Sequence, residues 1–81
     1  MSRNDKLIEK ACVHPGSLTF EELVRLAGLF GFRQCRQKGS HRIFSRKGHQ
    51  HFNFQESGGM AKTAQVRPFM DHVRALGWIE D

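Results

Sequence analysis

The feature that most constrains the fold is an apolar repeat that follows a helix-capping sequence. Apolar residues recur at i, i+3, i+4, i+7 and i+10, which gives a helix one apolar face: Phe20, Leu23, Val24, Ala27 and Phe30. Thr19 and Glu22 have the spacing of a capping box, in which each side chain bonds the other residue's backbone amide. Gly31 is placed to adopt the left-handed conformation after the helix. A helix with two defined ends is therefore predicted here.

The chain after Gly31 predicts strands. Phe52 and Phe54 alternate with polar neighbours, as a half-buried strand requires. Glycine-containing turns divide the region into three predicted strands, at residues 32–37, 41–46 and 51–55. Either Ile43 or Phe44 faces the core, because a shift of one residue exchanges the two faces of a strand. If Phe44 points inward, His41 and Ile43 lie on the open face.

Two further helices complete the predicted order. One covers residues 1–13 with Asn4 or Asp5 as its cap, and the other covers about residues 63–76. Pro68 is unfavourable inside the last helix, so this helix either begins near Arg67 or is kinked. Residues 56–62 are predicted to be a loop. The fold class is α+β, in the order α-α-β-β-β-α, with a three-stranded antiparallel sheet packed against helices.

The length of 81 residues allows one domain, spanning residues 1–81. We divide it into an N-terminal helical extension, residues 1–17, and a core, residues 18–79. The sequence shows no signal peptide and no apolar run long enough to span a bilayer. With only Cys12 and Cys35, a cytoplasmic location with free thiols is the expectation, and one bridge between them is the alternative.

The distribution of charge points to an anionic partner. The formal net charge is +5, and no acidic residue occurs between Leu23 and Gln55. Seven basic residues fall in that interval: Arg25, Arg33, Arg36, Lys38, Arg42, Arg46 and Lys47. A field of one sign favours a polyanion such as RNA or DNA, although the same residues could form an ordinary solvated face.

One basic, glycine-containing stretch, residues 36–42, combines cations with a histidine. His41 can move protons near neutral pH, and cations beside it can bind phosphate. The candidate phosphate-binding residues in this stretch are Arg36, Lys38, Gly39, Ser40 and Arg42. The alternative for His41 is an ordinary polar strand residue.

The other candidate motifs are weaker. Residues 49–51 carry two histidines, but the region has no cysteine or carboxylate partner, so no metal site and no cofactor are predicted. The glycine pair at 58–59 with Lys62 lacks a P-loop ending and is either a connector or a phosphate contact. Arg67, early in the last helix, could also contact an RNA phosphate.

These segments together resemble the HicA-type toxins, also called the YcfA-like family, over residues 18–76. The similar motifs are Phe20-Glu21-Glu22-Leu23-Val24-Arg25-Leu26, Gly31-Phe32, Arg36-Gln37-Lys38-Gly39-Ser40-His41-Arg42-Ile43-Phe44, Gly58-Gly59-Met60-Ala61-Lys62 and Gln65-Val66-Arg67. The most specific of them is Lys38-Gly39-Ser40-His41. Two departures are Arg42, where many members carry a second histidine, and Pro68 within the last helix.

The resemblance implies a fold like that of double-stranded-RNA-binding domains. It also implies the toxin of a type II toxin–antitoxin system, a stress-response endoribonuclease that cleaves mRNA and pairs with a HicB-type antitoxin. The family's active histidine corresponds to His41. We expect metal-independent cleavage, with a non-catalytic double-stranded-RNA-binding module and a protein adaptor as alternatives. The sequence does not predict an RNA sequence preference or an oligomeric state.

Overall fold

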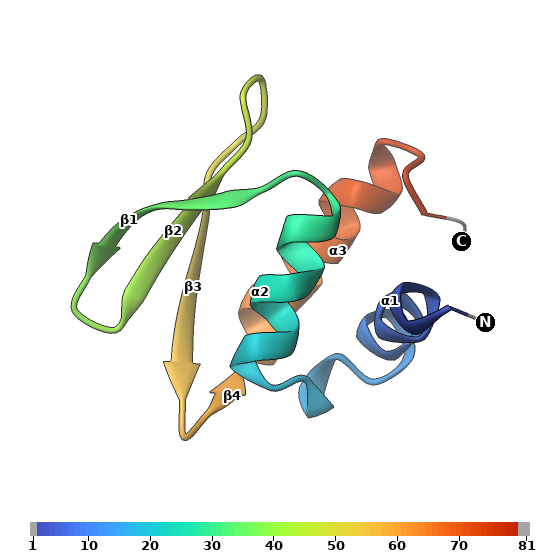
Figure 1. Ribbon diagram of the computed structural model, residues 1–81, viewed down its shortest axis with the longest axis horizontal. Helices are drawn as coiled ribbons and strands as arrows, with labels where there is room; N and C mark the ends of the chain where they lie inside the picture. Colours follow the sequence, from blue (N-terminus) through green and yellow to red (C-terminus); the bar gives the residue numbers. More distant parts are fainter. Residues whose placement is uncertain (1, 80–81) are drawn as a thin grey trace.

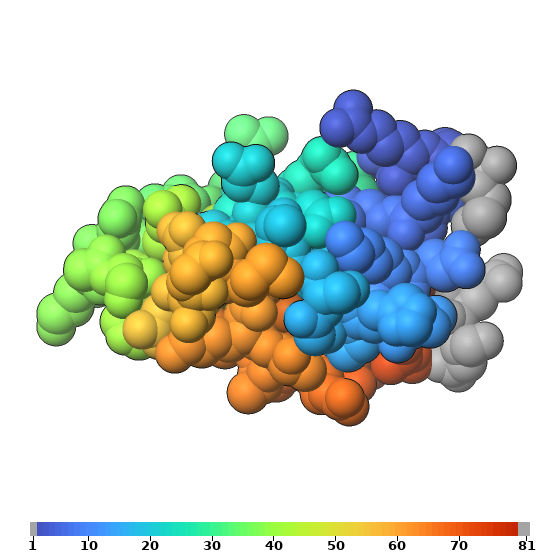
Figure 2. Space-filling view, turned by 90° about the horizontal axis from the view of Figure 1, so that it is seen from below, coloured from blue at the N-terminus to red at the C-terminus, as the bar shows by residue number. Residues whose placement is uncertain are grey.

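The computed structural model describes residues 2–79 as an antiparallel sheet with helices on one side (Figure 1). The elements follow one another as α1 (Arg3–Val13), η1 (Pro15–Ser17), α2 (Phe20–Leu29), β1 (Arg33–Lys38), β2 (His41–Ser45), β3 (Phe52–Ser57), β4 (Met60–Ala61) and α3 (Thr63–Ala75). Helices α2 and α3 lie next to the sheet, and α1 lies beyond them. Seen from below, the β1–β2 hairpin and α1 lie at opposite ends of the molecule (Figure 2). The predicted α+β class and the antiparallel sheet are confirmed.

Phenylalanine rings join the sheet to α3. The Phe69 ring of α3 lies 5.1 Å from the Phe52 ring and 5.7 Å from the Phe54 ring, both on β3. Phe32, just before β1, approaches the Phe69 ring to 5.3 Å. Aromatic pairs at such distances pack favourably edge to face. All four side chains are buried, so this cluster forms the centre of the core.

The burial of Phe44 answers the question that the sequence left open in β2. Phe44 is 2% exposed and Ile43 is only partly buried, so Phe44 points toward the helices. Side chains alternate along a strand, and directly paired residues share a face. The face away from the helices, called the open face below, therefore carries Arg36, Lys38, His41, Ile43, Asn53 and Gln55.

The sheet has four strands rather than three, because the predicted loop at 56–62 contains β4. Met60 and Ala61 pair with Ser57 and Glu56 of β3. The Ala61 amide also donates to the carbonyl of Leu18, at 3.0 Å. The bond to Leu18 joins segments about forty residues apart, whereas the pairing of β4 with β3 is local and closes over the two-residue turn Gly58–Gly59.

The cap of α1 differs from the prediction, and the structure decides between the two alternatives for the start of α3. Ser2, rather than Asn4 or Asp5, caps α1, and Asp5 completes a capping box with it. Helix α3 begins at Thr63 and continues through Pro68, so a start near Arg67 is wrong. Proline removes one amide donor, which would have bonded the carbonyl of Ala64. Pro68 and Ala64 are both exposed, and water can satisfy that carbonyl.

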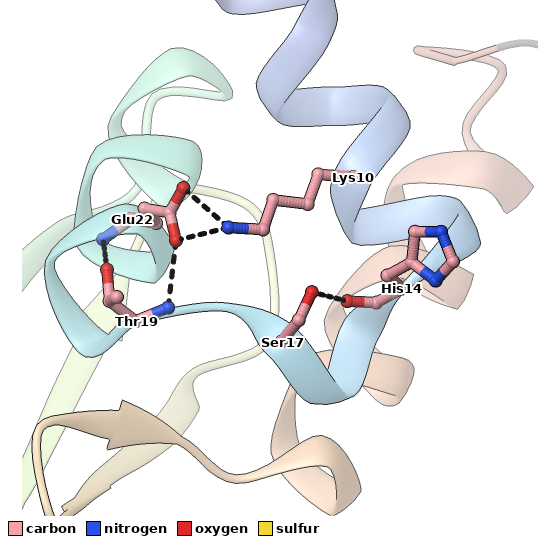
Figure 3. Close-up of polar contacts among 5 residues, drawn as sticks. All are labelled: Lys10, His14, Ser17, Thr19 and Glu22. Atoms are coloured by element: carbon pink, nitrogen blue, oxygen red, sulfur yellow. Dashed lines mark hydrogen bonds and ion pairs between the residues drawn. The ribbon is translucent and has the colours of Figure 1, made fainter.

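Glu22 ties the N-terminal segment to the core (Figure 3). Its carboxylate accepts from the Thr19 amide at 2.9 Å and from the Lys10 ammonium of α1 at 2.9 and 3.1 Å. The bond from the Thr19 amide and then the bond from Lys10 lower the pKa of Glu22. One carboxylate thus caps α2 and anchors α1, whose Leu7 and Ala11 are buried in the core.

Other expectations for the fold are confirmed. The Thr19 capping box is present, and Gly31 and Gly77 have positive φ at the ends of α2 and α3. Cys12 and Cys35 are free thiols. Within residues 2–79, no helix has both the length and the apolar character needed to cross a membrane.

Replacing Thr19 with alanine tests the cap of α2. Thr19→Ala removes the acceptor of the Glu22 amide and should lower the free energy of unfolding by about 1 kcal/mol. Thr19→Ser keeps the hydroxyl and should unfold at the same urea concentration as the wild type. Equal losses in the two variants would show that the hydroxyl does not stabilise the helix.

Candidate functional site

His41 is exposed on the open face, at the first position of β2. It follows the turn at Gly39 and Ser40, and Gly39 has a φ of 61°, a conformation that favours glycine. Directly across the β1–β2 ladder, His41 pairs with Lys38, so the imidazole and an ammonium group share this face. The turn therefore places together Lys38 and His41, the two ends of the motif that the sequence analysis found most specific.

A hydrogen bond connects the His41 ring to β3. Its Nδ1 atom lies 3.3 Å from the Oδ1 atom of Asn53. Asn53 lies diagonally across the ladder, because His41 pairs with Gln55 and Asn53 is two residues earlier. Side chains on such diagonals lie within reach of one another.

Gln55 links three parts of the chain beside His41. Its Oε1 accepts from the ammonium of Lys62 at 2.9 Å, and its Nε2 donates to the hydroxyl of Ser40 at 3.2 Å. Its own backbone amide donates to Oε1 of Gln65, on the first turn of α3, at 2.7 Å. The structure thus brings Lys62, which is remote in sequence, to the same site as Ser40.

The cations around His41 have no carboxylate partner among the described residues. None of the three ion pairs within residues 2–79 involves Arg36, Lys38 or Lys62, and all three side chains are exposed. A cation without a paired carboxylate attracts an approaching anion more strongly than a neutralised one does. Positive charge therefore lies on two sides of the site: Arg36 and Lys38 on β1, and Lys62 at the start of α3.

Arg42 does not belong to this group. It alternates with His41 in β2, and its guanidinium lies 4.8 Å from the Phe20 ring centre and 3.9 Å from the carboxylate of Glu56. These contacts place it on the helix side of the sheet, in a hollow that Thr19 and Glu21 also line. The phosphate contact expected of Arg42 would have to form there, away from His41.

Arg67 also lies apart from His41. It lines a hollow between α3 and α1, together with Ala11 and Cys12 of α1. Helix α1 is on the far side of the helix layer from the sheet. The structure therefore gathers Arg36, Lys38, Gly39, Ser40 and Lys62 near His41, but not Arg42 or Arg67.

Sequence reasoning missed Asn53 and Gln55. The available signal was the alternation of residues 52–55, which buries two phenylalanines and turns the two amides outward. Pairing with His41 could not be derived from that pattern, because the register of β2 against β3 is a tertiary feature.

A pair of histidines, His49 and His72, lies outside the open face. The Nδ1 atom of His49 is 3.3 Å from the Nε2 atom of His72 on α3. Both rings approach Phe32, and His49 also contacts Trp78, at 5.1 Å between ring centres. Among residues 2–79 no group of three or more metal-ligating side chains comes together.

Comparison of the chain with protein-family models, with curated proteins and with solved structures finds no match. The class that the fold and site define is an α+β protein with a cationic, histidine-bearing sheet face.

The environment of His49 predicts a pH dependence of stability. Burial, then the nearby Arg46 charge and then His72 lower the pKa of His49 below its usual 6.5. The unfolded chain therefore binds more protons than the folded protein just below pH 6.5. The free energy of unfolding should consequently decrease as the pH is lowered through that range.

Urea unfolding measured between about pH 7.5 and 5.5 checks this expectation. A His49→Gln variant should lose less stability over that range than the wild type, whereas a His14→Gln control should lose as much. Glu22 does not interfere, because its carboxyl titrates below 4.5. Identical pH profiles for wild type and His49→Gln would contradict the assignment.

Proposed function

We propose that this chain is a HicA-type toxin, a metal-independent endoribonuclease that cleaves mRNA with His41 as its catalytic residue. The observation that carries the proposal is the exposed His41 imidazole, paired across the ladder with Lys38 and beside the Ser40–Gln55–Lys62 network. General acid–base chemistry on RNA requires a titratable group close to phosphate-binding cations, and this group has both.

The arrangement of elements supports the family resemblance. From α2 to α3 the chain runs α-β-β-β-α, with the helices on one face of the sheet, apart from the short β4. This order is compatible with the double-stranded-RNA-binding-domain fold that the resemblance implies. The strand β4 is an addition to that arrangement.

The proposed reaction uses the ribose of the substrate as nucleophile. His41 removes the proton of a 2′-hydroxyl, whose oxygen attacks the adjacent phosphorus as the P–O5′ bond breaks. The proton then passes from the imidazolium to the leaving 5′-oxygen, which leaves a cyclic phosphate and a free 5′-hydroxyl. The nucleophile belongs to the RNA itself, and this mechanism therefore does not call for a metal-bound water.

The cations of the open face stabilise the phosphoryl oxygens in this mechanism. Lys38 pairs with His41 across the ladder, Lys62 bonds the side chain of Gln55, the other ladder partner of His41, and Arg36 lies further along β1. Fixed positive charges stabilise negative charge that develops in a transition state without reorganising at the moment of reaction. Gly39 and Ser40 allow the RNA backbone to approach the turn closely.

The partner in this proposal is a HicB-type antitoxin. An acidic surface on the antitoxin that covers Lys38 and His41 would exclude RNA from the open face. The proposed setting is the cytoplasm of a cell under stress, where release of the antitoxin exposes that face.

The first test is a nuclease assay on His41→Ala. The variant should cleave RNA at least about 100-fold more slowly, the lower range of acid–base catalysis, and should no longer arrest growth. Because His41 is exposed, the free energy of unfolding should change by less than about 0.5 kcal/mol. His14→Ala, at the exposed end of α1, is the matched control and should cleave normally.

A folded His41→Ala protein that cleaves at the wild-type rate would refute the catalytic assignment. A gel-shift assay on the same proteins separates the alternatives. Wild-type protein that binds double-stranded RNA but releases no product would favour the non-catalytic module. Absence of RNA binding at low salt would favour an adaptor that meets an acidic protein.

The second test is chelation. Cleavage should continue unchanged in excess EDTA, because the proposed nucleophile and base are the 2′-hydroxyl and His41. Loss of activity in EDTA that is restored by added Mg²⁺ or Zn²⁺ would contradict the metal-independent mechanism.

A further inference from the structure

We propose that Asn53 is a positioning residue that fixes the tautomer of His41. This inference rests on the proposed function. It specifies which of the two ring nitrogens of neutral His41 carries the proton. The Oδ1 atom of Asn53 lies 3.3 Å from Nδ1 of the ring. A carbonyl oxygen can only accept, so the bond requires a proton on Nδ1.

The consequence for catalysis is a lone pair on Nε2. Neutral imidazole carries one proton, and the nitrogen that bonds a neighbour determines which nitrogen is left free. In the Nδ1–H tautomer, Nε2 is the basic atom at the end of the ring furthest from the strand backbone. A 2′-hydroxyl arriving over the open face would meet that atom. A histidine without such a partner favours the opposite tautomer in water.

The packing of β3 restrains the position of Asn53, and so the position of its hydrogen bond to the His41 ring. Its two chain neighbours, Phe52 and Phe54, are 6% and 0% exposed and contact the Phe69 ring of α3. Asn53 therefore projects from a strand that is fixed on its other face. The β2–β3 ladder also pairs His41 with Gln55, which limits how far the two strands can slide.

A neutral amide suits this position better than a carboxylate. A carboxylate at the same distance would also accept from Nδ1–H, but its charge would favour the imidazolium form. His41 would then be protonated, and unable to act as base, up to a higher pH. Asn53 orients the ring without this effect.

The decisive measurement is nitrogen-15 NMR of the imidazole of His41 in uniformly labelled protein at alkaline pH. The wild type should show mainly the Nδ1–H tautomer. In Asn53→Ala the population should shift toward Nε2–H, whereas Asn53→Asp should keep Nδ1–H. Gln50→Ala, which removes an exposed amide from the β2–β3 loop, is the control and should match the wild type.

Kinetics supply a second readout that a purely structural role would not move. Asn53→Ala should reduce kcat by about tenfold with KM unchanged, since RNA binding depends on the cations. Asn53→Asp should move the acidic limb of the pH–rate profile upward by about one unit. Gln50→Ala should change neither.

Three results would overturn the inference: mainly Nε2–H in the wild type, a tautomer unaffected by Asn53→Ala, or an unchanged kcat in Asn53→Ala. Failure of the proposed function has a different signature, because it would appear as undiminished cleavage by His41→Ala. If the proposed function fails in this way, the NMR measurement still shows whether Asn53 fixes the tautomer of His41, because the measurement requires no RNA.

Discussion

Packing of phenylalanine rings between β3 and α3 is the interaction on which the rest of the structure depends. Phe52 and Phe54 contact Phe69, and this contact fixes which face of β3 is buried. Because side chains alternate along a strand, burying these rings turns Asn53 and Gln55 outward. The hydrophobic core thus determines the polar composition of the open face.

The same alternation removes Arg42 from the positively charged surface that the sequence suggested around His41. Arg42 is next to His41 in the chain, yet it lies over the Phe20 ring on the other side of the sheet and is paired with Glu56. Lys62 is twenty-one positions from His41 and reaches the site through Gln55. Proximity in sequence was therefore an incomplete guide to the cations near the imidazole, because it included Arg42 and did not include Lys62.

Much of the local structure could be predicted, because it depends on local bonds. The capping box of α2 and the positive φ at Gly31 follow from residues within a few positions of each other. The strand β4 was missed for a different reason: Gly58–Gly59 was interpreted as a connector or a phosphate contact, whereas it is the two-residue turn of a local β3–β4 hairpin. The sequence left open whether α3 starts near Arg67 or continues through Pro68, because the cost of a proline depends on whether solvent reaches the freed carbonyl.

The sequence by itself determined every element except β4 and the short η1, the excess of positive charge and the place of His41 after a glycine turn. Those features depend on propensities, capping and composition, which act over one or two turns of chain. Only the tertiary structure decided that Asn53 and Gln55 lie beside His41, that Lys62 bonds Gln55, and that Arg42 and Arg67 lie elsewhere. Strand register and helix packing set these contacts, and both come from burying rings that are distant in the chain.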